Sequence, residues 1–572
     1  MKWFDVSIES FSKNSLISKT ILPLGLVACG VAFAQTPPSA GSLNQQIERE
    51  QAPRAPAKAP PEIRIEPSAA PAVTDSDNQK ILVRSLHVTG AHVYAEATLL
   101  DVTGFSAGRE LTLSDLRSMA SKIARYYHMH GYLLAQAYLP AQDIKDGAVT
   151  IAVLEGRYGK VTLRNSTNLS DDLANGLLSG LDSNDAISIA PLETSLLLLS
   201  DLPGVNVKST LIPGASVGAS DLIVEVTPGQ RVTGSVDTDN EGNRYTGANR
   251  VGATVNLNDP TGHGDVATLR ALTSGTGLNY VRASYQAQLG RAKAGVAYAD
   301  MRYRLGKDFE SLQASGTAQI ASVYGSVPLI RSRSNNLYAV INFDAKTFQD
   351  KVDSTLTRAD KKARAAMASL TGDHRDGFGG GGLSTYALTW TTGQIDINSP
   401  AALATDAATV HSNGHYDKWG FNAMRLQSVT DTVSLYAAVN GQLASKNLDV
   451  SEKMELGGAN GVRAYPEGEA YADQGYVLNL EARALLPRLS ERQSGQMQLI
   501  GFVDTGTVTL NKNPWAAGQN RRTLSGAGIG LIWVDNNNFV VKASYARKLG
   551  NAPAISAPDE TGRFWLQAVK YF

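Results

Sequence analysis

The sequence predicts a mainly β protein, in which two small α+β modules precede a transmembrane antiparallel β-barrel that occupies the C-terminal three-fifths of the chain. Three observations lead to this prediction. Segments that alternate apolar and polar residues recur through residues 229–572. Two successive stretches before them share one pattern of strands and helices. The only long apolar run, about residues 21–33, is shorter than the ~20 residues that a membrane-spanning helix needs.

Charge and cysteine content exclude several classes of protein. The 53 Lys and Arg residues balance the 53 Asp and Glu residues, so bulk charge attracts neither nucleic acid nor an anionic membrane. Hydrophobic residues make up 43% of the chain, which is too many for a disordered protein. Because Cys29 is the single cysteine, the chain has no internal disulfide and no cysteine-built zinc or iron–sulfur site.

The N-terminal residues have the organisation of a secretory signal peptide, which we predict to span residues 1–34. A basic stretch precedes the apolar run, and the sequence from Ala32 to Ala34 supplies a small-x-small cleavage site. An alternative is a lipoprotein cleavage box from Leu26 to Cys29, which would leave Cys29 as a lipidated N-terminus. The intact mass of the processed chain distinguishes the two.

Residues 35–79 form a segment rich in Pro, Ala and Ser, which is typical of an extended linker. Residues 42–51 differ, because a capping box begins at Ser42 and Leu43 and Ile47 lie four residues apart on one helical face. We therefore predict a short helix, which would be marginal in isolation. Two interpretations stay open: a helix docked on the folded protein, or a transient helix in a disordered tail.

Two modules with one strand-helix-helix-strand-strand pattern follow, at residues 80–156 and 157–228. Each is small but large enough for one hydrophobic core. The predicted strands are residues 81–88, 132–139 and 149–154 in the first module and 159–163, 205–211 and 222–226 in the second, and the predicted helices begin at Ser114 and Pro191.

Residues 229–572 are predicted to form the barrel. Segments 280–289 and 295–305 alternate over lengths near the ~9 to 11 residues of a tilted membrane strand, whereas strands of soluble sandwiches commonly have ~5 to 6 residues. We place the apolar residues of both segments toward lipid and the polar ones toward a wet lumen. Hydrocarbon requires every backbone group to be paired, which a closed barrel achieves. About sixteen strands fit the available length.

Two motifs in this region resemble those of a known family. The sequence from Leu456 to Pro466 resembles a loop motif usually written Val-Arg-Gly-Tyr, and the sequence from Gly501 to Gly506 resembles a Phe-x-Asp-x-Gly strand motif. Both motifs belong to the outer-membrane transporters of two-partner secretion (TpsB type), the hemolysin secretion/activation family. The resemblance covers nearly the whole chain. It identifies the two modules as polypeptide-transport-associated (POTRA) modules and the short helix as a plug helix that occupies the barrel until substrate arrives.

The resemblance implies a contact between a loop and the barrel wall. A loop at about residues 450–475 would fold back into the barrel, so that Arg463 at its tip meets Asp504 on the inner wall. An arginine offers a rigid fork of donors to a carboxylate, and such a contact can pin a mobile loop. Either residue alone would ordinarily be solvated, and their order and surroundings favour the pair. The other motif residues are Gly461, Val462, Ala464 and Tyr465 in the loop and Phe502 and Gly506 in the strand.

The sequence departs from the family pattern at two positions. Ala464 stands where the loop motif has glycine, so a turn that needs positive φ there would be strained. Lys570 falls in the alternation register of Phe572 in the aromatic C-terminal strand, which an ideal assembly signal would not have.

No arrangement of residues predicts an enzyme, a cofactor or a metal site. The histidines include His411 and His415, but no His-Glu-x-x-His pattern is present, and no Gly-x-Ser-x-Gly elbow occurs. The glycine run at residues 379–382 is not followed by Gly-Lys-Ser/Thr, which makes it a flexible loop rather than a phosphate cradle.

The resemblance therefore implies a protein translocator in the outer membrane of a Gram-negative bacterium, with its POTRA modules in the periplasm. The modules would recognise a large unfolded exoprotein, such as an adhesin, hemolysin or contact-dependent toxin, and the barrel would export it without nucleotide hydrolysis. Outer-membrane lipid, periplasmic chaperones and the barrel-assembly machinery are further expected partners, and nucleic acid is not. The alternative is an assembly factor of the same superfamily, although such relatives usually carry more modules; a passive porin would need none.

Overall fold

The computed structural model describes residues 37–49, 60–66, 80–181, 183–488, 490, 494–535 and 538–572. The predicted signal peptide, with Cys29 and its alternative cleavage box, lies outside the described residues. Within the described ranges, no helix is both long and apolar enough to cross a membrane.

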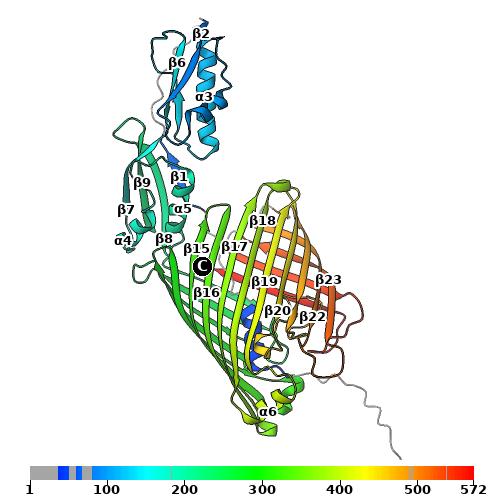
Figure 1. Cartoon of the computed structure of the whole chain (residues 1–572). Helices are drawn as coiled ribbons and strands as arrows, with labels where there is room; N and C mark the ends of the chain where they lie inside the picture. The colour runs from blue at the N-terminus through cyan, green and yellow to red at the C-terminus, as the bar shows by residue number, and fades with distance from the viewer. Residues whose placement is uncertain are drawn as a thin grey trace, which may run out of the picture. The chain divides into compact units, whose positions relative to one another are not determined.

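Sixteen antiparallel strands, β10 to β25 in chain order, close into one barrel, so the predicted fold class is confirmed (Figure 1). The ring closes where β10 pairs with β25, from Ser235 opposite Tyr571 to Asp239 opposite Gln567. Every barrel strand therefore has two neighbours, as hydrocarbon requires. The strands are β10 Val232–Asp239, β11 Arg250–Asn258, β12 Val266–Thr273, β13 Leu278–Leu289, β14 Ala292–Arg304, β15 Ala314–Arg331, β16 Asn335–Val352, β17 Thr357–Asp376, β18 Gly382–Ile397, β19 Gly414–Ser428, β20 Val433–Ala444, β21 Gln474–Leu485, β22 Gln496–Thr509, β23 Arg521–Val534, β24 Phe539–Lys548 and β25 Gly562–Tyr571.

The direction of the strands identifies the two ends of the barrel. Strand β10 follows directly on the second module, which the resemblance places in the periplasm, so its first residue marks the periplasmic end. Because neighbouring strands are antiparallel, β17, the eighth strand, runs back from the extracellular end to the periplasmic end. The extracellular connections contain η1 Lys307–Leu312, η2 Asp353–Thr355, α6 Pro400–Ala408 and η4 Val450–Glu452, and a periplasmic turn contains η3 Phe378–Gly380.

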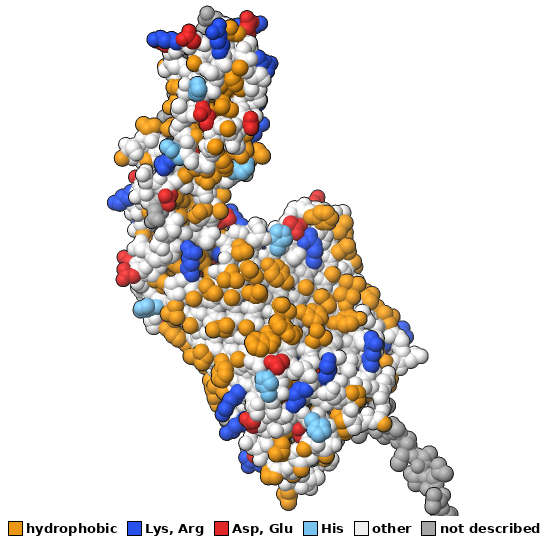
Figure 2. All heavy atoms as spheres, viewed as in Figure 1, with side chains coloured by type: hydrophobic (Ala, Val, Ile, Leu, Met, Phe, Trp, Pro, Cys, Tyr) orange, Lys and Arg blue, Asp and Glu red, His pale blue; other side chains and the backbone are white. Residues whose placement is uncertain are grey.

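The outer wall carries a band of exposed apolar side chains, which Figure 2 shows across the barrel. On β13, the side chains of Val281 and Tyr285 are exposed, as the alternation predicted. On β14 the prediction was wrong, because Met301 and Tyr303 face inward and are buried, whereas Tyr298 is exposed. The reason is that this part of the lumen holds an apolar core around a helix instead of water.

That helix is α1 Ala40–Arg49, which lies inside the barrel (Figure 1). Leu43 is 1% exposed and packs, together with Ile47, in a cluster of side chains from the inner wall. The predicted start at Ser42 was wrong: Ser39 and Ser42 exchange hydrogen bonds across the first turn, so the capping box begins three residues earlier. Residues 50 and 51 of the predicted helix lie outside the described residues.

The first module consists of β2 Ile81–Val83, β3 Ser85–Thr89, α2 Glu96–Thr103, β4 Arg109–Leu111, α3 Leu113–Met129, β5 Gln136–Tyr138 and β6 Ala148–Leu154. The predicted strand at residues 81–88 is divided at Arg84, because β2 pairs with β4 whereas β3 pairs with β6. Helix α3 begins one residue before the predicted start, where Thr112 and Asp115 form a capping box.

The second module consists of β7 Arg157–Asn165, α4 Asp171–Leu178, α5 Ile189–Ser200, β8 Val205–Pro213 and β9 Ala219–Pro228. A short strand from the predicted linker, β1 Glu62–Ile65, pairs in parallel with β8, which gives the sheet order β1-β8-β9-β7. These linker residues therefore cover one edge of the sheet.

Candidate functional site in the barrel lumen

The connection between β20 and β21, residues 445–473, folds back into the barrel. It is held in shape by its own backbone: Met454 and Ala472 exchange two hydrogen bonds, and the Val462 N–H donates to the Leu456 carbonyl. Leu456, Val462 and Ala464 are fully buried, so the loop has an apolar core of its own against the inner wall.

The structure brings Arg463, at the tip of this loop, onto Asp504 of β22. Arg463 Nε and Nη2 donate to the two carboxylate oxygens of Asp504, each at 2.8 Å, and the Arg463 backbone N–H donates to Asp504 at 3.1 Å. Asp504 is fully buried. The contact is bidentate and charge-assisted, which makes it stronger and more directional than an ordinary hydrogen bond.

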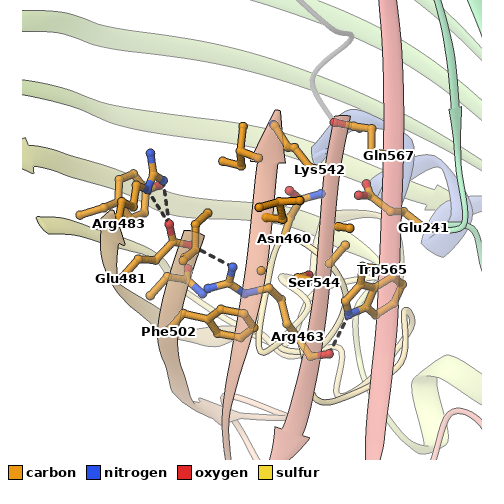
Figure 3. A pocket seen from close by; sticks show the side chains of 18 of the residues that line it. Glu241, Asn460, Arg463, Glu481, Arg483, Phe502, Lys542, Ser544, Trp565 and Gln567 are labelled. Carbon is orange, nitrogen blue, oxygen red and sulfur yellow. Dashed lines mark hydrogen bonds and ion pairs between the residues drawn. The ribbon is translucent and has the colours of Figure 1, made fainter. Parts of the chain in front are cut away.

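Four further side chains surround the pair, and Figure 3 labels three of them, Glu481, Phe502 and Trp565, around Arg463. Arg463 Nη1 lies 2.8 Å from Glu481 Oε1, and its guanidinium carbon lies 3.5 Å from the centre of the Phe502 ring. The Trp565 indole donates to the Arg463 carbonyl at 2.7 Å. Asn479 Nδ2 donates both to Asp504, at 2.8 Å, and to the Gly461 carbonyl, at 2.9 Å. The tip is therefore bound to β21, β22 and β25 at once.

The charges of this cluster balance. Glu481 also pairs with Arg483 at 2.7 Å, so two arginines face two carboxylates. Because buried ions are costly to leave unpaired, loss of one member strands another, and the arrangement favours a single position of the loop. Arg463, Glu481 and Arg483 of the cluster, with Arg49 of α1, line a cavity of about 450 Å³.

Glycines at two places let the loop approach the wall. A Cβ built at Gly506 would lie 2.4 Å from Leu456 Cδ1, and one at Gly526 would lie 2.5 Å from Ala464 Cβ. A Cβ at Gly528 would instead meet the Tyr545 carbonyl and the Phe502 ring, both of the barrel wall. The last position of the strand motif is thus a packing requirement, since any side chain there would displace the loop.

Ala464 adopts no positive φ, so the strain considered for this position does not arise. The left-handed backbone of the loop falls instead on Gly458, Gly468 and Ala470. Tyr465 is fully buried and its hydroxyl donates to the Ala552 carbonyl at 3.0 Å. Lys570, the other departure from the family pattern, lies 4.6 Å from the centre of the Phe539 ring.

A second group of buried ions joins the base of the loop to the opposite wall. Glu452 of η4 lies between Lys418 of β19, at 2.9 Å, and Lys346 of β16, at 3.2 Å. Lys346 also lies 3.6 Å from Glu48 of α1. Further ion pairs of the loop are Lys361 with Asp449, Lys453 with Asp473, Arg522 with Glu469 and Arg49 with Glu455.

Sequence reasoning did not find Asn479, Glu481, Trp565 or the two lysines that hold Glu452. A signal existed for Asn479 and Glu481, because they are the polar positions of an alternating segment and therefore face the lumen. For Trp565, the only signal in the sequence was its position in an aromatic strand. Nothing in the sequence near Lys346 or Lys418 points to a partner more than thirty residues away.

Comparisons with known proteins agree with this architecture. The sequence profile of the family described as Haemolysin secretion/activation protein ShlB/FhaC/HecB matches residues 218–532, and that of the ShlB-type POTRA domain matches residues 81–156. The heme/hemopexin transporter protein HuxB of Haemophilus influenzae strain 86-028NP is 27% identical over 100% of this chain and 99% of its own length.

Two further relatives carry the name CdiB. The outer membrane transporter CdiB of Dickeya dadantii is 24% identical over 67% of this chain and 69% of its own. The solved structure of CdiB from Escherichia coli superposes with a TM-score of 0.68 at 20% identity, covering 89% of this chain and 93% of that one, which supports the fold.

The inward loop and the arginine at its tip lie within residues 218–532, which a family profile spanning more than half of the chain matches. The chain belongs to the haemolysin secretion/activation protein family, the outer-membrane transporters of two-partner secretion.

Proposed function

We propose that the protein exports a large exoprotein through its barrel in an unfolded state, and that the structure represents the closed resting transporter. The observation that carries this proposal is the content of the lumen. Helix α1 and the inward loop are both held against the inner wall, by an apolar cluster and by buried ion pairs. A polypeptide can pass only after at least one of them moves.

Helix α1 acts as the plug in this account. Its buried face includes Ala40 and Leu43, and its polar side chains contact the loop: Gln45 donates to the Lys453 carbonyl and Gln46 to the Tyr471 hydroxyl. The helix is short, so its stability comes from these contacts and not from its own propensity. Withdrawal of α1 would therefore remove some of the contacts that hold the loop in the lumen.

The Arg463–Asp504 contact acts as the latch of the loop. Its bidentate geometry holds the tip in the resting position, while Glu481 and Phe502 provide the surroundings in which the guanidinium is stable. We propose that export requires this latch to form and to be released in each transport cycle.

The POTRA modules would receive the exoprotein in the periplasm. In the first module the sheet order β3-β6-β5 leaves β5 as an edge strand, with unpaired backbone groups that an extended segment can bind by strand addition. In the second module β8 is covered by β1, and β7 is the other edge.

We further propose that folding of the exoprotein outside the cell draws the chain outward, because burial of its apolar residues prevents return. Secretion reconstituted in proteoliposomes without nucleotide tests this energy source. Export of the adjacent large secreted gene product, scored by surface exposure, should proceed without ATP. A strict requirement for added nucleotide would contradict the proposal.

A further inference from the structure

The outer wall of the barrel carries a group of cations at the extracellular edge of its apolar band. On β17 the outward-facing side chains include Arg364 and Lys362, and both are exposed. Outward-facing Ala366, Ala368 and Leu370 follow on the same face, toward the periplasmic end. Figure 2 shows Lys and Arg side chains between the apolar band and the end of the barrel that carries α6.

The length of β17 places Arg364 at the boundary of the membrane. The next polar outward positions on the periplasmic side begin at His374, ten residues along the strand. At about 3.3 Å per residue and a tilt of about 40°, ten residues span roughly 25 Å across the bilayer, which is the height of the apolar band of a transmembrane barrel. Arg364 and Lys362 therefore lie at the level of the headgroups of the outer leaflet.

Two more cations belong to the same surface. Lys351 on β16 is exposed and lies directly opposite Arg358 of β17 in the strand register. We call Lys351, Arg358, Lys362 and Arg364 the rim patch. Like charges directly opposite on neighbouring strands repel each other, and an anion bound between the strands would remove that repulsion.

Two carboxylates on β17 and β18 offset part of the charge of the rim patch. Asp360 lies 2.8 Å from Arg358, and Asp396, opposite Lys362, accepts a hydrogen bond from Gln394 at 3.0 Å. The residues opposite Arg364 are Ala345 and Gln394, which carry no charge. Within the described part of the chain, Lys351, Lys362 and Arg364 make no ion pair, so their charges are available to a ligand.

We infer that the rim patch binds the phosphorylated sugar headgroup of the glycolipid that forms the outer leaflet, the lipid A part of lipopolysaccharide. Its phosphates supply the oxygens that Arg and Lys recognise. Its acyl chains would lie along the apolar band, beginning at Ala366 and Ala368, where small side chains leave room. This binding is independent of the exoprotein and of the lumen.

The test is a titration of the purified full chain in detergent with synthetic bisphosphorylated lipid A, followed by native mass spectrometry. The same lipid without phosphates serves as the reference ligand. We expect the wild type to bind the phosphorylated lipid at least about tenfold more tightly, because charge-assisted hydrogen bonds are the strong ones. The Lys362→Gln/Arg364→Gln variant should bind both lipids alike.

The matched control is Arg231→Gln/Arg291→Gln, which removes two exposed cations at the periplasmic end and should keep the wild-type affinity. Arg364→Lys, which retains the charge, should keep part of it. Equal affinity of the wild type and the Lys362/Arg364 variant for phosphorylated lipid A would overturn the inference. So would full competition by excess inorganic phosphate, which would mark a site for free anions. Closure of each barrel is checked by its heat-modifiable migration, and the single variants replace the double one if it does not fold.

Discussion

Lys346 Nζ, on the inner wall, lies 3.6 Å from Glu48 Oε2 of the plug helix and 3.2 Å from Glu452 of the inward loop. One buried cation therefore contacts both the plug helix and the inward loop. Lys346 is 4% exposed, so its charge has little access to water and depends on these carboxylates. Movement of the helix and movement of the loop are thereby linked through this side chain, in addition to the direct contacts that Gln45, Gln46 and Arg49 make with the loop.

The first prediction concerns this link. Lys346→Met removes the attraction for Glu48 and weakens the hold on Glu452, so the open probability of the channel in planar bilayers should rise. Deletion of α1 in that background should then raise the open probability by less than it does in the wild type, because the contact through Lys346 is already lost. Lys307→Met, at an exposed lysine of the extracellular connection η1, is the control and should conduct like the wild type. Fully additive effects of Lys346→Met and the deletion would show that helix and loop are independent.

The second prediction concerns the latch. Arg463→Ala should lower secretion by at least about tenfold while the barrel still inserts, because loss of a buried ion partner costs on the order of 3 kcal/mol. Arg463→Lys should not restore secretion, since a single ammonium does not reproduce the bidentate contact with Asp504 together with the contact to Glu481. Arg302→Ala, on an exposed arginine of β14, provides the control. Normal secretion by both Arg463 variants would show that the Arg463–Asp504 contact is not needed for export.

The third prediction concerns the glycine of the strand motif. Gly506→Ala should lower the melting temperature of the protein and impair secretion, because the new Cβ would lie 2.4 Å from Leu456 Cδ1 of the loop. Overpacking of this kind typically costs about 1 to 3 kcal/mol. Leu456→Ala should recover part of the loss in the double variant, since it empties the occupied space. If the double variant is as impaired as the sum of the two single ones, the Leu456 contact is not the reason for the glycine.

The fourth prediction concerns the first POTRA module at low pH. A backbone hydrogen bond from Thr112, followed by its side-chain hydrogen bond, holds the pKa of Asp115 below its usual range. A carboxyl whose pKa is lower in the folded state stabilises that state above its unfolded pKa, and this contribution is lost as pH falls through the folded pKa. The protection factors of the α3 amides in the full chain, which correct the exchange rates for intrinsic exchange at each pH, should therefore fall below about pH 4. In Asp115→Asn this loss of protection at low pH should not occur. An unchanged pH profile of the variant would contradict the prediction.

Much of this architecture could be predicted from the sequence because closure in a membrane leaves a strong periodic signal. The loop and strand motifs led to Arg463 and Asp504, and the spacing of Leu43 and Ile47 led to the face that α1 buries. The periodicity of β14 led to a wrong assignment of its two faces. Alternation shows that the two faces of a strand differ, but it does not show which face contacts lipid. An apolar lumen around α1 reverses the usual assignment there.

Other parts of the site depend on register and could not be read from the chain. Glu452 meets Lys346 and Lys418 only because β16 and β19 stand at particular places around the barrel. The pairing of β1 with β8 joins residues separated by most of both modules. Such contacts follow from the closed ring, and a local pattern does not contain them.

The central claim is that the lumen is closed at rest by α1 and the inward loop. The most direct test is the conductance of the purified transporter in planar bilayers, with and without residues 36–60. We predict that the deletion raises the resting conductance well above that of the intact chain, and that added synthetic α1 peptide lowers it again. Equal conductance of the two proteins would contradict the claim.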